Sequence, residues 1–167
     1  MDSEATIRNI LYFANKKSMK KNTLFLVLFC VSSVGFSQNL AKDTTEIKNV
    51  IADFFELFVQ DDIAYFEKNC TPDFELYEVG KVWNADTLKN LISKRQAQKR
   101  IWVRTNEFRY IKFNVKKDVA WVSYFNTAYL TNATTSEKRI VRWLESVVLV
   151  RQNRKWLLAQ MHSTSIK

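Results

Sequence analysis

The chain of 167 residues carries 26 Lys and Arg against 17 Asp and Glu, a net charge of +9, and contains one His, two Cys, two Gly and one Pro. So few glycines argue against phosphate-cradling loops, which need several, and one His with two Cys leaves no zinc site of ordinary composition. The basic residues are spread along the chain, so we interpret the charge as solvated surface rather than as a nucleic-acid interface.

Residues 1–37 contain the layout of a secretory signal. A short basic segment begins at Met19, an apolar run over residues 23–34 follows, and small residues precede a cleavage position after Ser37. The run is shorter than the roughly 20 residues of a membrane span. We therefore predict a signal peptide at about residues 19–37 and an exported, periplasmic or extracellular domain over residues 38–167. Whether translation starts at Met1 or Met19 stays open.

Helical periodicity dominates the first part of that domain. Asp43 with Glu46 three residues later fits a capping box, and apolar residues then recur every three or four positions as far as Phe58. A short second helix is expected over residues 63–69. A third is expected to begin at a cap on Asn84 or Asp86 and to run to about Lys99.

Between the second and third helices, a turn at residues 71–73 leads into a predicted strand over residues 74–79. Gly80 marks a bend, after which residues 81–83 pair back. From residue 101 the period changes to two, with segments dense in β-branched and aromatic residues. These later strands are predicted at about residues 102–115, 119–131, 139–152 and 155–165. The element order indicates an α+β fold.

The segment over residues 139–152 is apolar on both alternating faces. One face is expected to cover the helices, and the other would expose more apolar surface than a soluble monomer usually carries. We therefore predict a homodimer formed through the outer sheet face. A protein partner on that face is the alternative, and Val147 is interpreted as one of its outward residues.

The last segment carries Trp156 and, six residues later, the single histidine, His162. This closing strand, the turn at residues 71–73 and the bend at Gly80 together resemble the NTF2-like superfamily, especially its SnoaL-like branch. The resemblance covers roughly residues 44–165. It implies a cone in which about three N-terminal helices pack on a curved antiparallel sheet around a pocket, a scaffold that hosts unrelated chemistries.

Ketosteroid isomerases are a known enzymatic template on this scaffold, and the resemblance places Glu78 where they carry their base. A partly buried carboxylate there could abstract a proton next to a carbonyl. Two departures count against isomerase chemistry: Phe54 stands where the template has a tyrosine, and Ser146 or Val147 where it has a second acid. Without those donors an enolate lacks its main stabilisation.

His162 is the other catalytic candidate. If alternation places it on the face of Trp156, Leu158 and Gln160, its imidazole points inward and could act as a base or bind a polar ligand group. A structural histidine at the sheet end is the alternative. Ser163 is expected on the opposite face, which argues against a Ser-His pair.

Aromatic residues of a cone are expected to line its pocket in part, which suits a flat or apolar ligand. Arg142 beside Trp143 could bind a carboxylate. Opposite charges among the other charged strand residues, including Glu107, Arg109 and Glu145, could pair across strands on the outer face, which is the commoner outcome, and any one of them could instead line the pocket. The predicted ligand-binding residues are Trp83, Tyr77, Phe54, Tyr124, Trp156 and Arg142.

Three functions remain open on this basis. The leading one is a non-catalytic protein that binds a small apolar or aromatic molecule, with no cofactor, metal or nucleic acid and no membrane contact after signal cleavage. The second is a cofactor-independent isomerase or cyclase that uses His162 or Glu78 as base. The third is an interaction module that uses the outer sheet face.

Overall fold

The computed structural model describes residues 40–98 and 100–167, of which Asp43–Lys167 form one compact unit. The predicted signal peptide lies outside the described residues, and the third helix ends at Gln96, three residues before the expected end at about Lys99. Within the described ranges, no helix is long and apolar enough to cross a membrane.

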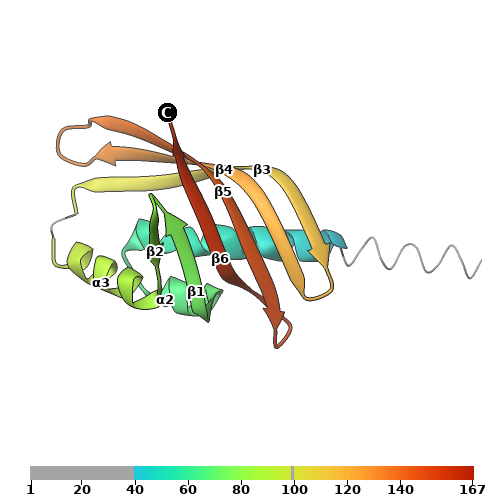
Figure 1. Cartoon of the computed structure of the whole chain (residues 1–167). Helices are drawn as coiled ribbons and strands as arrows, with labels where there is room; N and C mark the ends of the chain where they lie inside the picture. The colour runs from blue at the N-terminus through green and yellow to red at the C-terminus, as the bar shows by residue number, and fades with distance from the viewer. Residues whose placement is uncertain (1–39, 99) are drawn as a thin grey trace, which may run out of the picture. The chain divides into compact units, whose positions relative to one another are not determined.

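Six strands form a single curved, unclosed sheet in the order β2-β1-β6-β5-β4-β3 (Figure 1). The β1 and β6 strands run parallel, and every other neighbouring pair is antiparallel. This is the α+β fold with a mostly antiparallel sheet that the sequence predicts. The strands are β1 (Cys70–Glu78), β2 (Lys81–Trp83), β3 (Trp102–Lys116), β4 (Val119–Asn132), β5 (Lys138–Gln152) and β6 (Lys155–Ile166).

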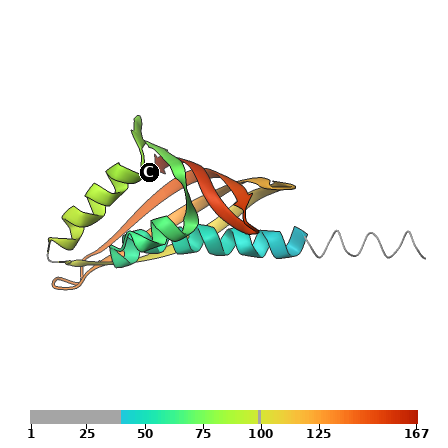
Figure 2. The ribbon, with the colours of Figure 1, turned by 90° about the horizontal axis from the view of Figure 1, so that it is seen from below.

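Helices pack on one face of this sheet. A long helix, described over residues 40–60, is followed by α2 (Ala64–Asn69), and α3 (Ala85–Gln96) follows β2. Figure 2 shows the long helix and α2 beneath the sheet and α3 towards one end of it. We call the helix-covered side of the sheet the inner face and the opposite side the outer face.

The predicted helix caps have different outcomes. Asn84 caps α3 as expected, because its side chain accepts a hydrogen bond from the Thr87 amide. The capping box at Asp43 is wrong, because residues 40–42 are already helical. The Asp43 carboxylate instead lies 2.5 Å from Arg151 and accepts a hydrogen bond from the Trp156 indole at 3.4 Å. It therefore ties the long helix to β5 and β6.

The apolar core lies between the long helix and the inner face. Ile47, Ile51, Phe54 and Leu57 repeat at helical spacing and are completely buried, which is the face that the sequence periodicity predicts. They are packed in one cluster with inward residues of the strands. On β1, β4, β5 and β6 the buried members are Cys70, Phe74, Leu76, Ala120, Val122, Tyr124, Val147, Leu149, Trp156, Leu158 and Met161.

Alternation along β5 separates the two faces. Val147 and Leu149 are buried against the helices, whereas Ile140 and Leu144 are about half exposed, with exposed fractions of 51% and 42%. The interpretation of Val147 as an outward residue is therefore wrong. The apolar outer face itself is present, and its exposed members across three strands are Val103, Ile111, Val119, Trp121, Tyr129, Ile140 and Leu144.

Candidate functional site

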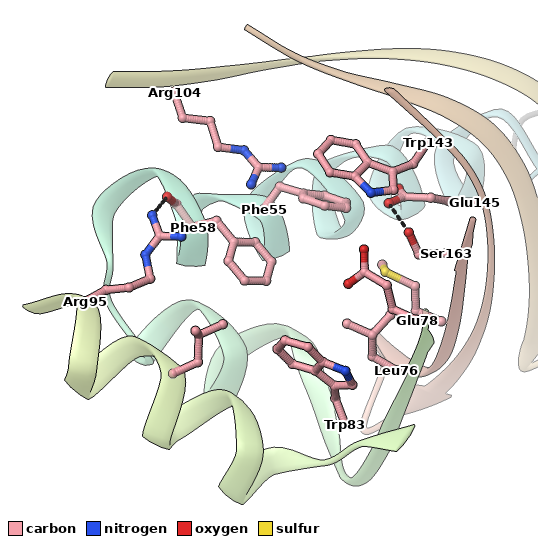
Figure 3. Close-up of a pocket in the computed structure, with 12 residues that line it drawn as sticks. Phe55, Phe58, Leu76, Glu78, Trp83, Arg95, Arg104, Trp143, Glu145 and Ser163 are labelled. Atoms are coloured by element: carbon pink, nitrogen blue, oxygen red, sulfur yellow. Dashed lines mark hydrogen bonds between the residues drawn. The ribbon is translucent and has the colours of Figure 1, made fainter. Parts of the chain in front are cut away.

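A cavity of about 160 Å³ lies between the inner face and the helices. Its walls come from the long helix, β1, β2, α3 and the inner face of β3, β5 and β6, so residues distant in sequence meet there (Figure 3). The lining residues are Phe55, Phe58, Leu76, Glu78, Trp83, Leu91, Arg95, Arg104, Trp143, Glu145, Met161 and Ser163.

Aromatic side chains form much of the wall. Phe55 and Phe58 are three residues apart on the long helix, so both project to the same side, with ring centroids 6.2 Å apart. Trp83 ends β2, and Trp143 lies on the inner face of β5. Rings from three separate elements therefore enclose the space, which suits a flat or apolar ligand.

Glu145 brings a carboxyl group into this apolar wall. The residue is only 4% exposed, and its Oε1 accepts a hydrogen bond from the Ser163 hydroxyl at 3.2 Å. Oε2 is buried without a hydrogen-bond partner in the described structure. Burial raises the pKa of Glu145 to about 7, because the low-dielectric surroundings disfavour the carboxylate more than nearby polar groups favour it. The group can therefore hold or release a proton near neutral pH.

Two buried polar residues of β4 lie next to Glu145. Tyr124 is its direct cross-strand partner, and Asn126 pairs with the neighbouring Trp143. The Tyr124 hydroxyl and both amide atoms of Asn126 have no hydrogen-bond partner in the described structure. Burial raises the pKa of Tyr124 well above its usual value, so this phenol stays protonated. Both residues favour ionisation of Glu145, although neither meets hydrogen-bond geometry with it.

Arg104 is the partly buried cation of the cavity. Its Nε donates a hydrogen bond to the Asn106 side chain at 3.0 Å, and its guanidinium lies 5.4 Å from the Phe58 ring centroid and 5.5 Å from that of Trp143. Desolvation lowers the pKa of Arg104 to about 10, which leaves it charged at neutral pH. The second cavity arginine, Arg95, is bound at 2.5 Å to Asp61.

The sequence matches the model of the SnoaL-like domain family over residues 47–166. The chain belongs to this family. A comparison with functionally curated proteins finds no match. The family therefore assigns the fold and leaves the ligand and the reaction open.

Solved structures agree with the SnoaL-like assignment. A ketosteroid isomerase-like protein from Erwinia carotovora atroseptica is 17% identical, with a TM-score of 0.57, over 74% of this chain and 95% of that one. An NTF2-like protein of unknown function from Prochlorococcus marinus is 18% identical, with a TM-score of 0.58, over 74% and 93%. The CaMKII hub homology domain of Chlamydomonas reinhardtii is 16% identical, with a TM-score of 0.65, over 75% and 99%. At these identities the similarity shows the fold alone.

Two predicted site residues of the SnoaL-like domain line the cavity, namely Glu78 and Trp83. Their roles stay predictions. Phe54 and Tyr124 are completely buried in the core beside the cavity, and Trp156 is buried near the Asp43 end of the long helix.

Other predicted site residues lie away from the cavity. Tyr77 follows the inward residue Leu76 on β1, and its hydroxyl donates a hydrogen bond to Glu75. Arg142 is exposed on the outer face, beside the inward-facing Trp143, and does not line the cavity.

His162 is exposed on the outer face, contrary to the expected alternation. The register between β5 and β6 shifts between Val148 and Leu149, which pair with Gln160 and Leu158, so Ala159 is an extra residue on β6. One extra residue exchanges the two faces beyond it. Trp156 and Leu158 therefore point inward while His162 points outward, and Ser163 takes the inward place.

Sequence reasoning did not assign the polar groups that face the cavity from β3 and β5. For Glu145 the sequence leaves open both an ion pair on the outer face and a place in the pocket wall, and the sequence pattern does not single out Arg104. The sequence does contain a signal for Glu145. It is an even number of residues from Trp143, Val147 and Leu149 along the strand, so it shares their inward face. In the described part of the chain, no group of three or more His, Cys, Asp or Glu side chains is placed to hold a metal ion.

Proposed function

We propose that this SnoaL-like domain binds a small molecule with a single aromatic or similarly flat ring, and that a hydroxyl or amine group of the ligand donates a hydrogen bond to Glu145. The main support for this proposal is the buried Glu145 carboxyl on the wall of an aromatic cavity, which accepts one hydrogen bond from Ser163. A carboxyl group has about four lone-pair positions, so most of its acceptor capacity is unused.

The cavity size supports a ligand of one ring. A volume of about 160 Å³ is close to the roughly 150 Å³ of an engineered apolar cavity that binds benzene. Steroid-sized molecules would need more room than this cavity alone offers. The polar group distinguishes the proposed ligand from benzene, because a ligand without a donor would leave the buried carboxyl under-satisfied.

Phenol and anisole make a pair of probes for this proposal, since they share a ring and an attached oxygen, and anisole carries a methyl group in place of the donor proton. We expect phenol to shift amide resonances of the cavity residues in an NMR titration and to bind about 5- to 20-fold more tightly than anisole, as one hydrogen bond to a charged or partly charged group predicts. Glu145→Leu should remove this preference, whereas Glu107→Leu on the outer face should keep it. Equal binding of both probes to the unmodified protein would refute the role of Glu145.

A second candidate function is proton transfer without a cofactor. Glu78 and Glu145 line the same cavity, and the charge of Glu78 contributes to the raised pKa of Glu145. A protonated Glu145 could stabilise an enolate oxygen while Glu78 removes the carbon-bound proton. Acetophenone in D₂O is a suitable probe: catalysed exchange of its methyl protons that Glu78→Gln abolishes would favour this function over binding alone.

We further propose that the protein is exported and associates as a homodimer through the outer face. The signal-like residues 19–37 support export, and the exposed apolar side chains of β3, β4 and β5 support self-association. N-terminal sequencing of the secreted protein tests cleavage after Ser37. Sedimentation analysis tests the dimer, and a monomer at all concentrations would leave the outer face to a different protein partner.

A further inference from the structure

The cavity is polarised along its length. Figure 3 shows Arg104 at one side, with Glu78, Glu145 and Ser163 grouped at the other side. Arg104 also borders a second hollow of about 420 Å³, which shares Arg95, Arg104 and Trp143 with the cavity. The Arg104 guanidinium therefore lies where the enclosed cavity meets a wider space, and a ligand that enters from there passes it.

Arg104 lacks the carboxylate partner that two other partly buried arginines of the domain have. Arg95 contacts Asp61 at 2.5 Å, and Arg151 contacts Asp43 at 2.5 Å. Among the described residues, no carboxylate forms an ion pair with Arg104, and its one hydrogen bond within the protein goes from Nε to Asn106. The guanidinium has five N–H donors, so the fork formed by its terminal nitrogens is left to face the aromatic wall.

A partly desolvated cation without an adjacent anion is unfavourable unless something compensates it, and the ring contacts of Arg104 with Phe58 and Trp143 compensate it in part. Burial is the largest cause of the lowered pKa of Arg104, and the positive charge of Arg95 lowers it further. The more distant carboxylates of Glu145 and Glu78 favour the charged form only in part. An anionic group that binds the free fork would supply the missing partner, and a planar carboxylate matches the geometry of the fork best.

We propose that the ligand of this cavity is an aromatic or similarly flat carboxylic acid whose carboxylate binds the Arg104 guanidinium, with its ring between Phe58 and Trp143 and its hydrogen-bond donor directed towards Glu145. This inference rests on the proposed binding function and adds the chemical class of the ligand. The carboxylate of the ligand binds Arg104 at one side of the cavity, and its hydrogen-bond donor faces Glu145 at the other side. These two contacts fix the orientation of the ligand.

The test compares 4-hydroxybenzoate with 4-hydroxybenzamide, which share a ring and a hydroxyl group and differ in the charged group. In NMR titrations of the purified protein at pH 7.5, we expect the carboxylate to bind at least about tenfold more tightly than the amide, as a charge-assisted, two-point contact predicts. Arg104→Gln should reduce this ratio to near one. Arg104→Lys, which keeps the charge and loses the fork, should give an intermediate ratio.

Arg109→Gln is the matched control. Arg109 lies on the same strand and also stacks on a ring, 4.2 Å from the Phe125 centroid, but it is exposed on the outer face. This variant should keep the full preference for the carboxylate. Equal binding of the two probes to the unmodified protein, or a preference that survives Arg104→Gln, would overturn the inference even if phenol binds. If phenol and both of these probes leave the cavity resonances unchanged, the proposed binding function fails as well.

Because the two probes are first compared on the unmodified protein, the test does not depend on whether Arg104→Gln folds. If the amide spectrum of Arg104→Gln loses its dispersion, the variant is unfolded. The ratio of carboxylate to amide affinity measured for Arg104→Lys then replaces the ratio for Arg104→Gln. A ratio for Arg104→Lys equal to that of the unmodified protein would mean that charge alone acts, which overturns the two-point contact with the fork.

Discussion

The two faces of the sheet use the same strands and the same residue types for different purposes. On the inner face, Glu145 and Arg104 are surrounded by aromatic rings, and burial alters the pKa of both. On the outer face, Glu107 accepts a hydrogen bond from the Tyr129 hydroxyl at 2.8 Å, and Arg109 stacks on Phe125 within reach of water. The pKa of a charged residue in a strand therefore depends on the side chains and helices that bury it, and alternation along the strand decides which face, and so which environment, the residue has.

The largest expected effect comes from placing the same charge on each face of β5. Val147 is 1% exposed and Leu144 is 42% exposed. Val147→Lys buries an ammonium group in the apolar core with no partner, so we expect a loss of at least about 3 kcal/mol in the free energy of unfolding. Leu144→Lys should change the stability of the monomer by less than about 0.5 kcal/mol. Chemical denaturation measures both, and similar losses would contradict the assignment of the two faces.

The titration of Glu145 gives the next largest effect. The pKa of this carboxyl is about 7 in the folded protein against an ordinary value of 4.5. Between these two values the folded state holds a proton that the unfolded state has released, so the free energy of unfolding falls as the pH rises from 4.5 to 7. The complete shift corresponds to at most about 3 kcal/mol.

Glu145→Gln removes this titration. Relative to the unmodified protein, the variant should therefore be more stable at pH 8 than at pH 5, by up to about 3 kcal/mol in the difference between the two. Denaturation midpoints at both pH values measure it, and Glu107→Gln on the outer face serves as the matched control. A flat pH dependence of the Glu145→Gln comparison would show that the carboxyl is ionised normally.

The elements of this fold were predictable because their apolar residues follow simple periods. The long helix, α2 and the four long strands lie within a few residues of the expected ranges, and Asn84 caps α3 as predicted. Burial of Ile47, Ile51 and Phe54 follows from their spacing alone. The helical state of residues 40–42 was not predictable, because a capping-box pattern at Asp43 does not reveal that the helix already exists before it.

The site was less predictable, for two physical reasons. A single extra residue, Ala159, leaves no mark in the alternating pattern of β6, yet it turns His162 outward and Ser163 inward. Buried charges are the second reason. Arg and Glu are residue types that usually mark the exposed face of a strand, and only the packing of the long helix and α3 over the inner face encloses Arg104 and Glu145. Glu78 was found because the resemblance linked its position to a pocket.

Self-association tests the outer face by itself. Trp121 and Leu144 are exposed by 40% and 42% on neighbouring strands, so a dimer through this face would bury both. We expect Leu144→Lys to weaken the dimer about 10- to 100-fold, since an unpaired charge then enters an apolar contact. Sedimentation velocity across a concentration series measures it. Val103→Lys on the edge strand β3 is the comparison. Its effect on the dimer should be smaller, because Val103 lies far from the centre of the contact.

The smallest expected effect concerns α3, which covers one end of the inner face and leaves the outer face untouched. The Asn84 side chain accepts hydrogen bonds from the Thr87 amide and from the Thr87 hydroxyl, both at 3.0 Å, and so satisfies the first turn of the helix. Asn84→Ala should lower the free energy of unfolding by about 1 kcal/mol, whereas Asn84→Asp should retain the cap. Because α3 carries Leu91 and Arg95 to the cavity, amide shifts in the alanine variant should concentrate around the cavity. Equal amide shifts at residues whose side chains lie on the outer face would mean that the two faces respond together and that the inner face is not an independent unit.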